Sequence, residues 1–593
     1  MNVMVFLLIS LIVHAVPIPY DRGMLRFNRL LKWLPVRMIW GTVAWIFICL
    51  IVGMTLPWAL ISLVMSFALL LLFAGGLRPG NIEQMIERAR MPLMCIGLLI
   101  IIIMPVFSGI IGWTSDVSNA QYVNDYFIIE SDEPLFSSPI LDDHVRLVTD
   151  AYASYVARQQ FASIGSNIEI AAAHITTRGD RLVWVCVVVS TNVLAENYVK
   201  ALIVVDANDP TNVEVITDVQ IPVGEGLFWD RNIQFGNYLS DMTNAYEYAY
   251  PTWDPLGNLV YVQTRTQLGF DFVERPLGPV IYCQNGSIFY FDTVEDTPDW
   301  VTQAYSEEWL ERQVNRWGGY RRGSGFDLFA GGFLWAIQPS NDRLEMTEDT
   351  RYILNPDTDL VEGIVTVHPP GSSSLTLSGV LRATKQGIFY HDLSAEGIQS
   401  GEAAINEVIK AFPQPVTGSY FGAMPLLYPV QVNATYYRYA WYCPIYWLDG
   451  YYDSESEEYY ILDIRLHAFA MADAKDVTTS FMLERTGSLR GAALVQAVRE
   501  GWVEEIGGEI IEEPVDTFNL TANVTSVSSY VEDGDTRIVL GTSNATYQFI
   551  EGARSWMNLT DWYTLLNLAV DDNFTATIQV VGEQYRIVAI VKN

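Results

Sequence analysis

Four apolar runs near the N-terminus constrain the fold of this chain more than any other feature. They cover residues 2–17, 38–56, 57–77 and 91–112. A helix that crosses a bilayer needs about 20 predominantly apolar residues, and only the first run is clearly shorter. A buried helix of a soluble protein seldom stays apolar on every face. The sequence therefore predicts a transmembrane region of four helices over residues 1–112.

Basic residues between these runs set the expected orientation. They are Arg22, Arg26, Arg29, Lys32 and Arg37 after the first run, and Arg78, Arg88 and Arg90 before the fourth. Short loops rich in Lys and Arg stay on the cytoplasmic side. We therefore expect a multi-pass cell-membrane protein whose N-terminus and large C-terminal domain are extracytoplasmic. The first run has no basic residue ahead of it, and Pro17 follows its small-residue site, so we expect a retained helix and not a cleaved signal peptide.

The charge of the chain is strongly acidic. It has 593 residues, with 35 Lys+Arg against 68 Asp+Glu and a formal net charge of −33. Binding to nucleic acid needs basic surface that neutralises phosphates, so we expect no nucleic-acid partner. Half of the residues are apolar, which excludes a largely disordered chain. Few lysines beside many carboxylates fit a host adapted to high salt, and the alternative is an extracellular protein that is acidic without such adaptation.

Seven Asn-x-Ser/Thr sequons follow the apolar region, five of them in the last eighty residues. These glycosylation candidates are Asn285, Asn433, Asn519, Asn523, Asn544, Asn558 and Asn573. Such crowding is typical of a glycosylated outer surface. The sequons thus agree with an extracytoplasmic C-terminal domain.

Three of the five cysteines lie beyond the apolar runs, at Cys186, Cys283 and Cys443. An oxidising location permits one internal disulfide among three thiols. The candidate pair is Cys283 with Cys443. The alternative of three buried free thiols on apolar strands stays open.

After residue 113 the pattern changes to helices that alternate with short strands. Helices are expected near 142–162, 231–249, 306–317, 402–412 and 488–500, and apolar strand runs include 181–190 and 198–210. Asp206-Ala207-Asn208-Asp209 and Asp473-Ala474-Lys475-Asp476 end two comparable runs. We therefore predict an α+β fold of repeated helix-plus-antiparallel-sheet units at 113–300 and 301–510. Neighbouring units must stack, because one alone buries too little apolar surface.

Two alternatives concern this middle region. The segment 251–258 resembles the turn of a propeller blade, but the helices between strand pairs argue against propeller repeats, which are nearly all β. The aromatic run from Tyr436 to Tyr452 is expected to pack in a sheet. A contact face for carbohydrate or protein is the alternative for that run.

The last residues, 511–593, differ from the rest. Their expected order is three strands, a helix and two strands, with a hairpin turn at Asp533-Gly534. This order suits a small OB-like β-barrel. Because the region is acidic and rich in sequons, we expect a structural or protein-binding barrel and not a nucleic-acid module.

Two stretches carry a resemblance to a known family. They are ALIVVDANDP at 201–210 and NGSIFYFDTVEDTPDWVTQAYSEEWLERQVNRWGGY at 285–320. Their strand–turn–helix pattern is similar to that of large membrane-anchored proteins with cystatin-like or PepSY-like ectodomain repeats. The resemblance covers about residues 140–500 and implies architecture alone, because that family has no agreed activity.

No catalytic or metal-binding motif is recognisable. The histidines beyond the apolar runs, His144, His174, His368, His391 and His467, lack metal-ligand spacing, and no nucleophile elbow, phosphate loop or dinucleotide fingerprint occurs. Two acidic turns, at Asp453, Glu455, Glu457 and Glu458 and at Asp357 and Asp359, have the oxygen ligands that calcium prefers. Neither has the glycine and distal glutamate of an EF-hand loop, so solvated turns are favoured. We predict no catalytic residue, no metal ligand and no cofactor.

These observations favour a non-enzymatic, membrane-anchored cell-surface protein. Its ectodomain would serve assembly or binding of envelope components, as a homo-oligomer or with other envelope proteins. An accessory or sensory subunit of a membrane transport complex is the alternative, and an extracellular hydrolase is a weaker one. A hydrolase would need a cleft with perturbed carboxylates or a nucleophile–base pair.

Overall fold

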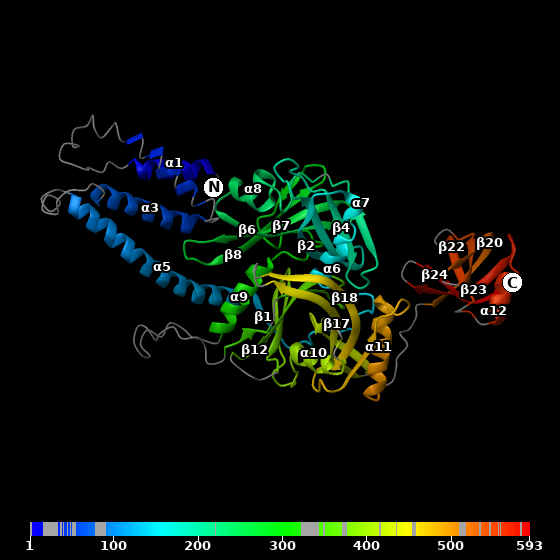
Figure 1. Ribbon diagram of the computed structural model, residues 1–593. Coiled ribbons are helices and arrows are strands. Elements are labelled where there is room, and N and C mark those ends of the chain that lie inside the picture. The colour runs from blue at the N-terminus through cyan, green and yellow to red at the C-terminus, as the bar shows by residue number, and fades with distance from the viewer. Residues whose placement is uncertain are drawn as a thin grey trace. The chain divides into compact units, whose positions relative to one another are not determined.

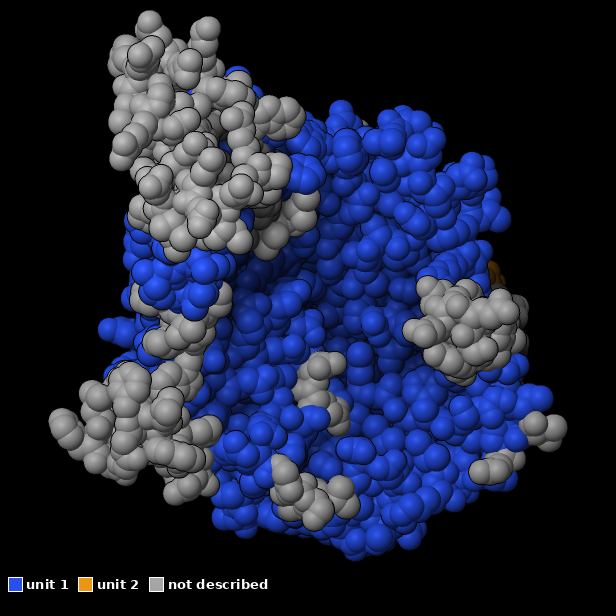
Figure 2. All heavy atoms as spheres, turned by 60° about the vertical axis from the view of Figure 1, so that its left-hand side comes forward, with its two compact units in different colours: residues 1–509 blue, residues 510–593 orange. Residues whose placement is uncertain are grey.

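The computed structural model describes residues 3–15, 55–76, 90–321, 343–508 and 517–592, together with scattered residues of 34–50. Short gaps fall at 220, 348–349, 371–375, 414, 416, 434–435, 454–457, 533–534, 545–546, 555–556, 558 and 582–583. The chain divides into two compact units, residues 1–509 and 510–593. Figure 2 colours these units blue and orange and shows the larger one hollowed near the centre of the view.

Strands hold 40% of the chain and helices 28%, so the fold is mostly β-sheet. The described helices are α1 (Val3–His14), α3 (Leu56–Gly76), α5 (Arg90–Tyr126), α6 (Asp150–Arg158), α7 (Phe161–Ile164), α8 (Ile233–Ser240), α9 (Glu307–Tyr320), α10 (Gly401–Lys410), α11 (Gly491–Glu505) and α12 (Leu559–Leu566). Figure 1 shows α1, α3 and α5 as a group of neighbouring helices beside the sheets.

Among the residues that the structure describes, no helix is both long and apolar enough to cross a membrane. This finding contradicts the predicted four-helix transmembrane region over 1–112, and with it the multi-pass topology and the cell-membrane location. Helix α1 has only 12 residues, about 18 Å at the usual rise, against a hydrocarbon thickness of about 30 Å. Helix α5 continues beyond its apolar part into a polar segment that ends at Tyr126, and α5 packs against α9.

Part of the apolar surface near the N-terminus is buried within the larger unit. Ala59 and Leu63 of α3 form a cluster with Trp45 and with Tyr238 and Met242, which lie in or beside α8. The basic residues Arg22, Arg26, Arg29, Lys32, Arg37, Arg78 and Arg88 lie outside the described residues, as does part of the run 38–56. The expected orientation therefore has no support from these segments.

Four sheets follow along the larger unit, each preceded by a helix. Sheet 1 has the order β2 (Ile168–Arg178), β3 (Arg181–Ser190), β4 (Ala201–Asp206), β5 (Val213–Ile216), and sheet 2 the order β6 (Asn244–Trp253), β7 (Leu259–Leu268), β8 (Glu274–Cys283), β9 (Ile288–Tyr290). Sheet 3 has the order β1 (Ile128–Ser131), β14 (Gly387–Asp392), β13 (Gly379–Thr384), β12 (Val361–His368), β10 (Glu345–Met346), with β11 (Arg351–Leu354) also paired to β12. Sheet 4 has the order β15 (Ser419–Gly422), β17 (Tyr436–Asp453), β18 (Glu458–Asp473), β19 (Ser480–Glu484), with β16 (Leu426–Asn433) also paired to β17. All of these strand pairs are antiparallel except β1 with β14, so the expected helix-then-sheet units are present.

The helices before the sheets share one kind of N-cap. Thr149, Asn232, Ser306 and Ser400 each accept the backbone N–H of the residue three positions on, at the starts of α6, α8, α9 and α10. Side-chain oxygens at this position satisfy an N–H that the helix cannot bond internally. The four capping residues therefore define where each unit begins.

Two predicted helices have the wrong extent. The helix expected at 231–249 ends at Ser240, because the Asp241 carboxylate accepts the Thr243 N–H at 3.0 Å in a turn that leads into strand β6. The helix expected at 142–162 begins only at Asp150, because Leu147 and Val148 donate their N–H groups to the carbonyl of Ala207 instead. The segment 251–258 forms the β6–β7 hairpin and no propeller blade.

Sheet 1 is buried on both faces, which explains its continuous apolar strands. Val183, Val185 and Val187 of β3 face a core shared with sheet 2. Trp184 and Cys186 face the opposite core, which α6 and sheet 4 complete. The sequence RLVWVCVVVS is therefore one strand with two buried faces.

The two Asp-Ala-x-Asp turns have the same structure. Asp206 accepts the N–H groups of Asn208 and Asp209, and Asp473 accepts those of Lys475 and Asp476. Each aspartate also pairs with an arginine on the neighbouring strand, Arg181 or Arg438. The sheet 1 and sheet 4 units thus repeat one turn.

The smaller unit is a closed barrel of five strands. They are β20 (Thr517–Glu532), β21 (Asp535–Thr542), β22 (Phe549–Ala553), β23 (Asn573–Val581) and β24 (Gln584–Lys592), in the order β20-β21-β22-β24-β23. Helix α12 lies between the third and fourth strands along the chain, and β22 pairs with β24 in parallel. The five-stranded barrel and its helix confirm the predicted order, although Asp533 and Gly534 lie outside the described residues.

Candidate functional site

A loop over residues 224–232, here called the aromatic loop, has exposed aromatic side chains and a backbone that is held by several hydrogen bonds. It joins β5 to α8 and carries Phe228 and Trp229, whose exposed fractions are 50% and 52%. Its ends are tied together, because Gly224 donates its N–H to the carbonyl of Arg231 and Ile233 donates to that of Gly224. Large exposed aromatic side chains on a fixed loop are typical of binding surfaces.

The side chain of Asn197 makes two hydrogen bonds to the backbone of this loop. Its Oδ1 accepts the Phe228 N–H at 2.7 Å, and its Nδ2 donates to the Phe228 carbonyl at 2.9 Å. The Asn197 carbonyl in turn accepts from Nη1 of Arg231 at 2.9 Å. The backbone of Phe228 is thus held as it would be in a strand pair, although it lies in a loop.

Glu225 connects the aromatic loop to residues of the neighbouring sheets. Its Oε2 accepts the Tyr261 hydroxyl at 2.8 Å and also contacts Nε2 of His174. Burial and the Glu225 charge raise the pKa of the Tyr261 hydroxyl well above its ordinary value. All three side chains are largely enclosed between sheets 1 and 2. This arrangement fixes the loop and leaves little room for a substrate at the carboxylate.

Trp229 has a left-handed backbone, with φ +57°. This conformation costs a non-glycine residue roughly 1–2 kcal/mol. Residues with such strained backbone conformations are found most often at functional sites. Gly226, with φ +70°, is required by space, since a Cβ there would lie 2.6 Å from Cβ of Ala171. The fold therefore keeps a strained tryptophan where a glycine would be easier.

The surroundings of the aromatic loop carry charges of both signs. Asp230 and Arg231 are exposed, and Glu196 and Lys200 form an ion pair of 2.8 Å on the neighbouring segment. Leu194 and Tyr198 add apolar surface there, at 76% and 47% exposed. No catalytic, metal-binding or glycosylation motif of the sequence falls in this loop, and its local signal is the Phe-Trp pair that follows Gly-Glu-Gly-Leu.

The predicted glycosylation candidates are mostly at the surface. Asn285, Asn519, Asn523 and Asn573 are exposed, Asn433 and Asn544 are half-buried, and Asn558 lies outside the described residues. Asn523 and Asn573 face each other on β20 and β23, with a hydrogen bond of 2.7 Å between their side chains. The structure thus groups two sequons at one point of the barrel, and their glycosylation stays a prediction.

The candidate disulfide between Cys283 and Cys443 does not form in the structure. Both thiols are free, as is that of Cys186. Cys443 is buried in the core around sheet 4, whereas Cys283 packs at the edge of a separate cluster in sheet 2. Burial raises the pKa of Cys186 and of Cys443 to about 12, which leaves both thiols protonated and unreactive.

The acidic turns provide little support for calcium. The Asp357 carboxylate accepts the backbone N–H groups of Ser137 and Ser138 at distances from 2.8 to 3.2 Å. Residues 454–457, the middle of the other turn, lie outside the described residues. In the part of the chain that the structure covers, no group of three His, Cys, Asp or Glu side chains is placed to hold a metal ion.

Comparison with protein-family models and with curated protein sequences finds no match for this chain. The resemblance to cystatin-like or PepSY-like repeats therefore stays a prediction about architecture.

Proposed function

We propose that this protein is a non-enzymatic binding protein that assembles with a second copy of itself through the aromatic loop. The observation that carries the proposal is the exposed pair Phe228 and Trp229 on a loop fixed by Asn197 and Glu225. A rigid aromatic anchor loses little conformational entropy on binding, which favours affinity. Tryptophan is also among the residue types most enriched at binding hot spots.

The charges beside the loop suit a contact between identical surfaces. In a two-fold symmetric interface the same surface of both copies is in contact, so that if residue i of one copy contacts residue j of the other, residue j of the first also contacts residue i of the second. Arg231 of one copy can then face Asp230 or Glu196 of the other, all of which have exposed side chains. Mixed charge at the rim therefore supports self-complementarity.

The net charge of −33 opposes this association at long range. Salt shortens the range of such repulsion, from about 10 Å at 0.1 M to about 3 Å at 1 M. The apolar contact between the two aromatic loops is not weakened when salt screens the charges. We therefore expect the dimer to become more stable as the salt concentration rises.

Sedimentation velocity on the purified full chain between 0.1 and 2 M NaCl tests the proposal. Trp229→Ala and Phe228→Ala should each weaken self-association at least tenfold. Leu256→Ala is the matched control, because Leu256 is 86% exposed in a hairpin turn of sheet 2. A wild-type chain that stays monomeric at every salt concentration would overturn the proposal, and so would equal association of Trp229→Ala.

A further substitution separates binding from folding. Trp229→Gly removes the aromatic contact and also relieves the left-handed strain, so we expect a monomer that is more stable by about 1 kcal/mol. Urea unfolding of the monomer measures this gain. Loss of both stability and association would instead indicate that Trp229 serves the fold.

A further inference from the structure

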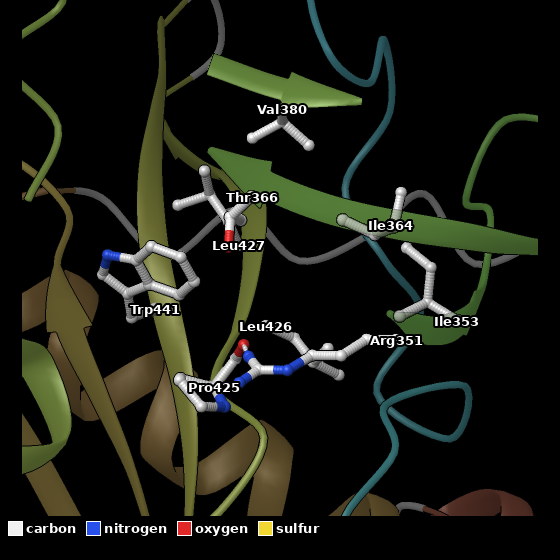
Figure 3. Close-up of a pocket in the computed structure, with 9 residues that line it drawn as sticks. All are labelled: Arg351, Ile353, Ile364, Thr366, Val380, Pro425, Leu426, Leu427 and Trp441. Carbon is white, nitrogen blue, oxygen red and sulfur yellow. Dashed lines mark hydrogen bonds between the residues drawn. The ribbon is translucent and has the colours of Figure 1, made fainter. Parts of the chain in front are cut away.

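The cavity between sheets 3 and 4 is too small for an organic ligand (Figure 3). Its volume is about 20 Å³, room for about one water-sized molecule. The side chains of Ile353, Val380 and Leu427 line it, and Arg351 reaches across from β11 toward Pro425 (Figure 3). Strand β9, at the edge of sheet 2, is by contrast open to solvent.

Strand β9 has exposed apolar side chains on both of its faces. It pairs with β8 on one side, and sheet 2 ends with it. Ile288, Phe289 and Tyr290 are 45%, 53% and 56% exposed. Successive residues of a strand point to opposite faces, so Phe289 lies on one face and the other two residues lie on the opposite one. An exposed apolar edge of this kind is a template for pairing with another strand.

The backbone groups that point away from the sheet belong to Ile288 and Tyr290. On the side of β8, Ser287 accepts a backbone hydrogen bond at 3.0 Å and Phe291 donates one at 3.2 Å. Phe289 lies midway between these two residues, so its N–H and C=O are also directed toward β8. The N–H and C=O groups of Ile288 and Tyr290 therefore point outward, and they have no hydrogen-bond partner among the residues that the structure describes.

We propose that β9 pairs with β9 of a second copy of the chain, antiparallel and across a two-fold axis at Phe289. In this register Ile288 of each copy lies opposite Tyr290 of the other, and the outward N–H and C=O groups of both strands bond to each other. The two Phe289 residues form a non-hydrogen-bonded pair, in which side chains are closest. Aromatic pairs and pairs of an aromatic with a β-branched residue are among those that stabilise antiparallel strands.

The charges of this segment favour pairing of the strand with itself. Residues 283–291 carry no charge, and the nearest carboxylate along the chain is that of Asp292. With the axis at Phe289, the two Asp292 residues lie six positions apart, about 20 Å along the strands. The screening length is about 10 Å at 0.1 M salt. The edge therefore meets its own copy without a contact between like charges.

This contact is separate from that of the aromatic loop, which joins β5 to α8. Two three-residue strands form a small interface, and small interfaces are weak and transient. We therefore expect the β9 contact at higher protein concentrations than the contact between aromatic loops. At such concentrations it would link dimers into longer assemblies. That consequence rests on the proposed function, whereas the strand pairing itself does not.

Cysteine crosslinking in the full-length Trp229→Ala chain tests the pairing without the aromatic-loop contact. Facing residues of a non-hydrogen-bonded pair have Cα atoms about 4.5 Å apart, a separation that a disulfide spans. Phe289→Cys in this background should form a covalent dimer on mild oxidation at least tenfold faster than the parent chain. The chain is produced without N-glycosylation, because the sequon residue Asn285 lies in the turn before β9.

Ile288→Cys and Tyr290→Cys, each in the same background, are the matched controls. Identical cysteines at either position would lie about 8 Å apart in the two copies, beyond the reach of a disulfide. Each control alone should crosslink no faster than the parent, in which the exposed Cys95 and the half-buried Cys283 set the background. Equal crosslinking of the controls and Phe289→Cys would overturn the proposal.

A mixture of the two control chains provides a second measurement that keeps Phe289 in place. Positions 288 and 290 of unlike copies face each other at about 5.5 Å between Cα atoms, so the mixture should form a disulfide that neither chain forms alone. If neither the mixture nor Phe289→Cys crosslinks, the β9 pairing is overturned. The proposed function is judged separately, by sedimentation of the wild-type chain.

Discussion

Trp184 and Trp441 make the same hydrogen bond in two different units of the chain. Trp184 donates its indole N–H to the carbonyl of Val148 at 2.8 Å, and Trp441 donates to that of Gln399 at 2.9 Å. In both units the acceptor directly precedes the N-cap residue of the helix that comes before the sheet. The strand–helix junction is therefore repeated, together with the aspartate turn that each unit carries.

Replacing either tryptophan by phenylalanine should have a similar cost. Trp184→Phe and Trp441→Phe each leave a buried carbonyl without its donor, so each should lower the free energy of unfolding by about 1–2 kcal/mol. Trp502→Phe is the control, because Trp502 is fully buried but its indole N–H has no partner among the described residues. Urea unfolding measures all three. A Trp502→Phe cost equal to the other two would show that lost volume, and not the hydrogen bond, decides the effect.

The two aspartate turns should respond differently to loss of their arginines. Asp473 is fully buried beside Arg438, whereas Arg181 is 55% exposed and lies 3.6 Å from Asp206. Arg438→Met leaves a buried carboxylate with only backbone donors and should cost about 2–3 kcal/mol. Arg181→Met should cost less than about 1 kcal/mol, because the Arg181 side chain is mostly exposed and its 3.6 Å contact with Asp206 is long, while Asp206 keeps its backbone donors. Equal losses in unfolding experiments would contradict this difference in burial.

Local patterns along the chain predicted the middle and the C-terminal barrel well. Ser306 followed by Glu307 and Glu308 marks the start of α9, because a capping side chain and early carboxylates stabilise a helix N-terminus. The alternation of apolar strands with turns likewise predicted the barrel. The helix expected at 231–249 is too long, since the apolar spacing of its second half also fits the strand at Asn244–Trp253, whose aromatic residues favour sheets.

Neither the N-terminal region nor the site could be predicted in this way. A hydropathy pattern does not show which apolar residues pack on the body, as Leu63 does against Tyr238. The aromatic loop depends on a contact between Asn197 and Phe228, which lie far apart in the sequence. Sequence spacing carries no information about contacts of this kind.

His391 should make stability depend on pH below neutrality. Its side chain is buried in β14, its Nδ1 lies 3.1 Å from the Glu133 carbonyl, and burial lowers its pKa from the ordinary 6.5, with the nearby Arg382 charge acting in the same direction. The unfolded chain therefore binds a proton at a higher pH than the folded chain, and the free energy of unfolding falls as the pH drops below about 6.5. His391→Gln should reduce this loss in unfolding measured from pH 7.5 to 5.0. His368→Gln is the control, and a pH dependence unchanged in His391→Gln would contradict the assignment.

Glu274 should fix the polar end of α5 to the larger unit. Its carboxylate accepts from Arg312 at 3.2 Å and from Arg316 at 3.2 Å, and its backbone N–H donates to Oδ1 of Asn119 in α5 at 2.8 Å. Arg316 also donates to Asp116 of α5 at 3.0 Å, so removal of the Glu274 charge removes a contact that positions Arg316 for this ion pair. The Glu274 side chain is only 19% exposed. Glu274→Gln should therefore lower the free energy of unfolding by about 2 kcal/mol, as expected for hydrogen bonds to a largely buried charge.

Hydrogen exchange separates this local role from a general loss of stability. Amides of residues 114–126 should exchange at least tenfold faster in Glu274→Gln, while those of the barrel at 517–592 should not change. Glu214→Gln provides the control, because Glu214 pairs with Arg178 where its side chain is 52% exposed. Such an exposed pair contributes less than about 1 kcal/mol. Unchanged exchange over 114–126 in Glu274→Gln would show that α5 is held by its apolar contacts with α9 and not by these ion pairs.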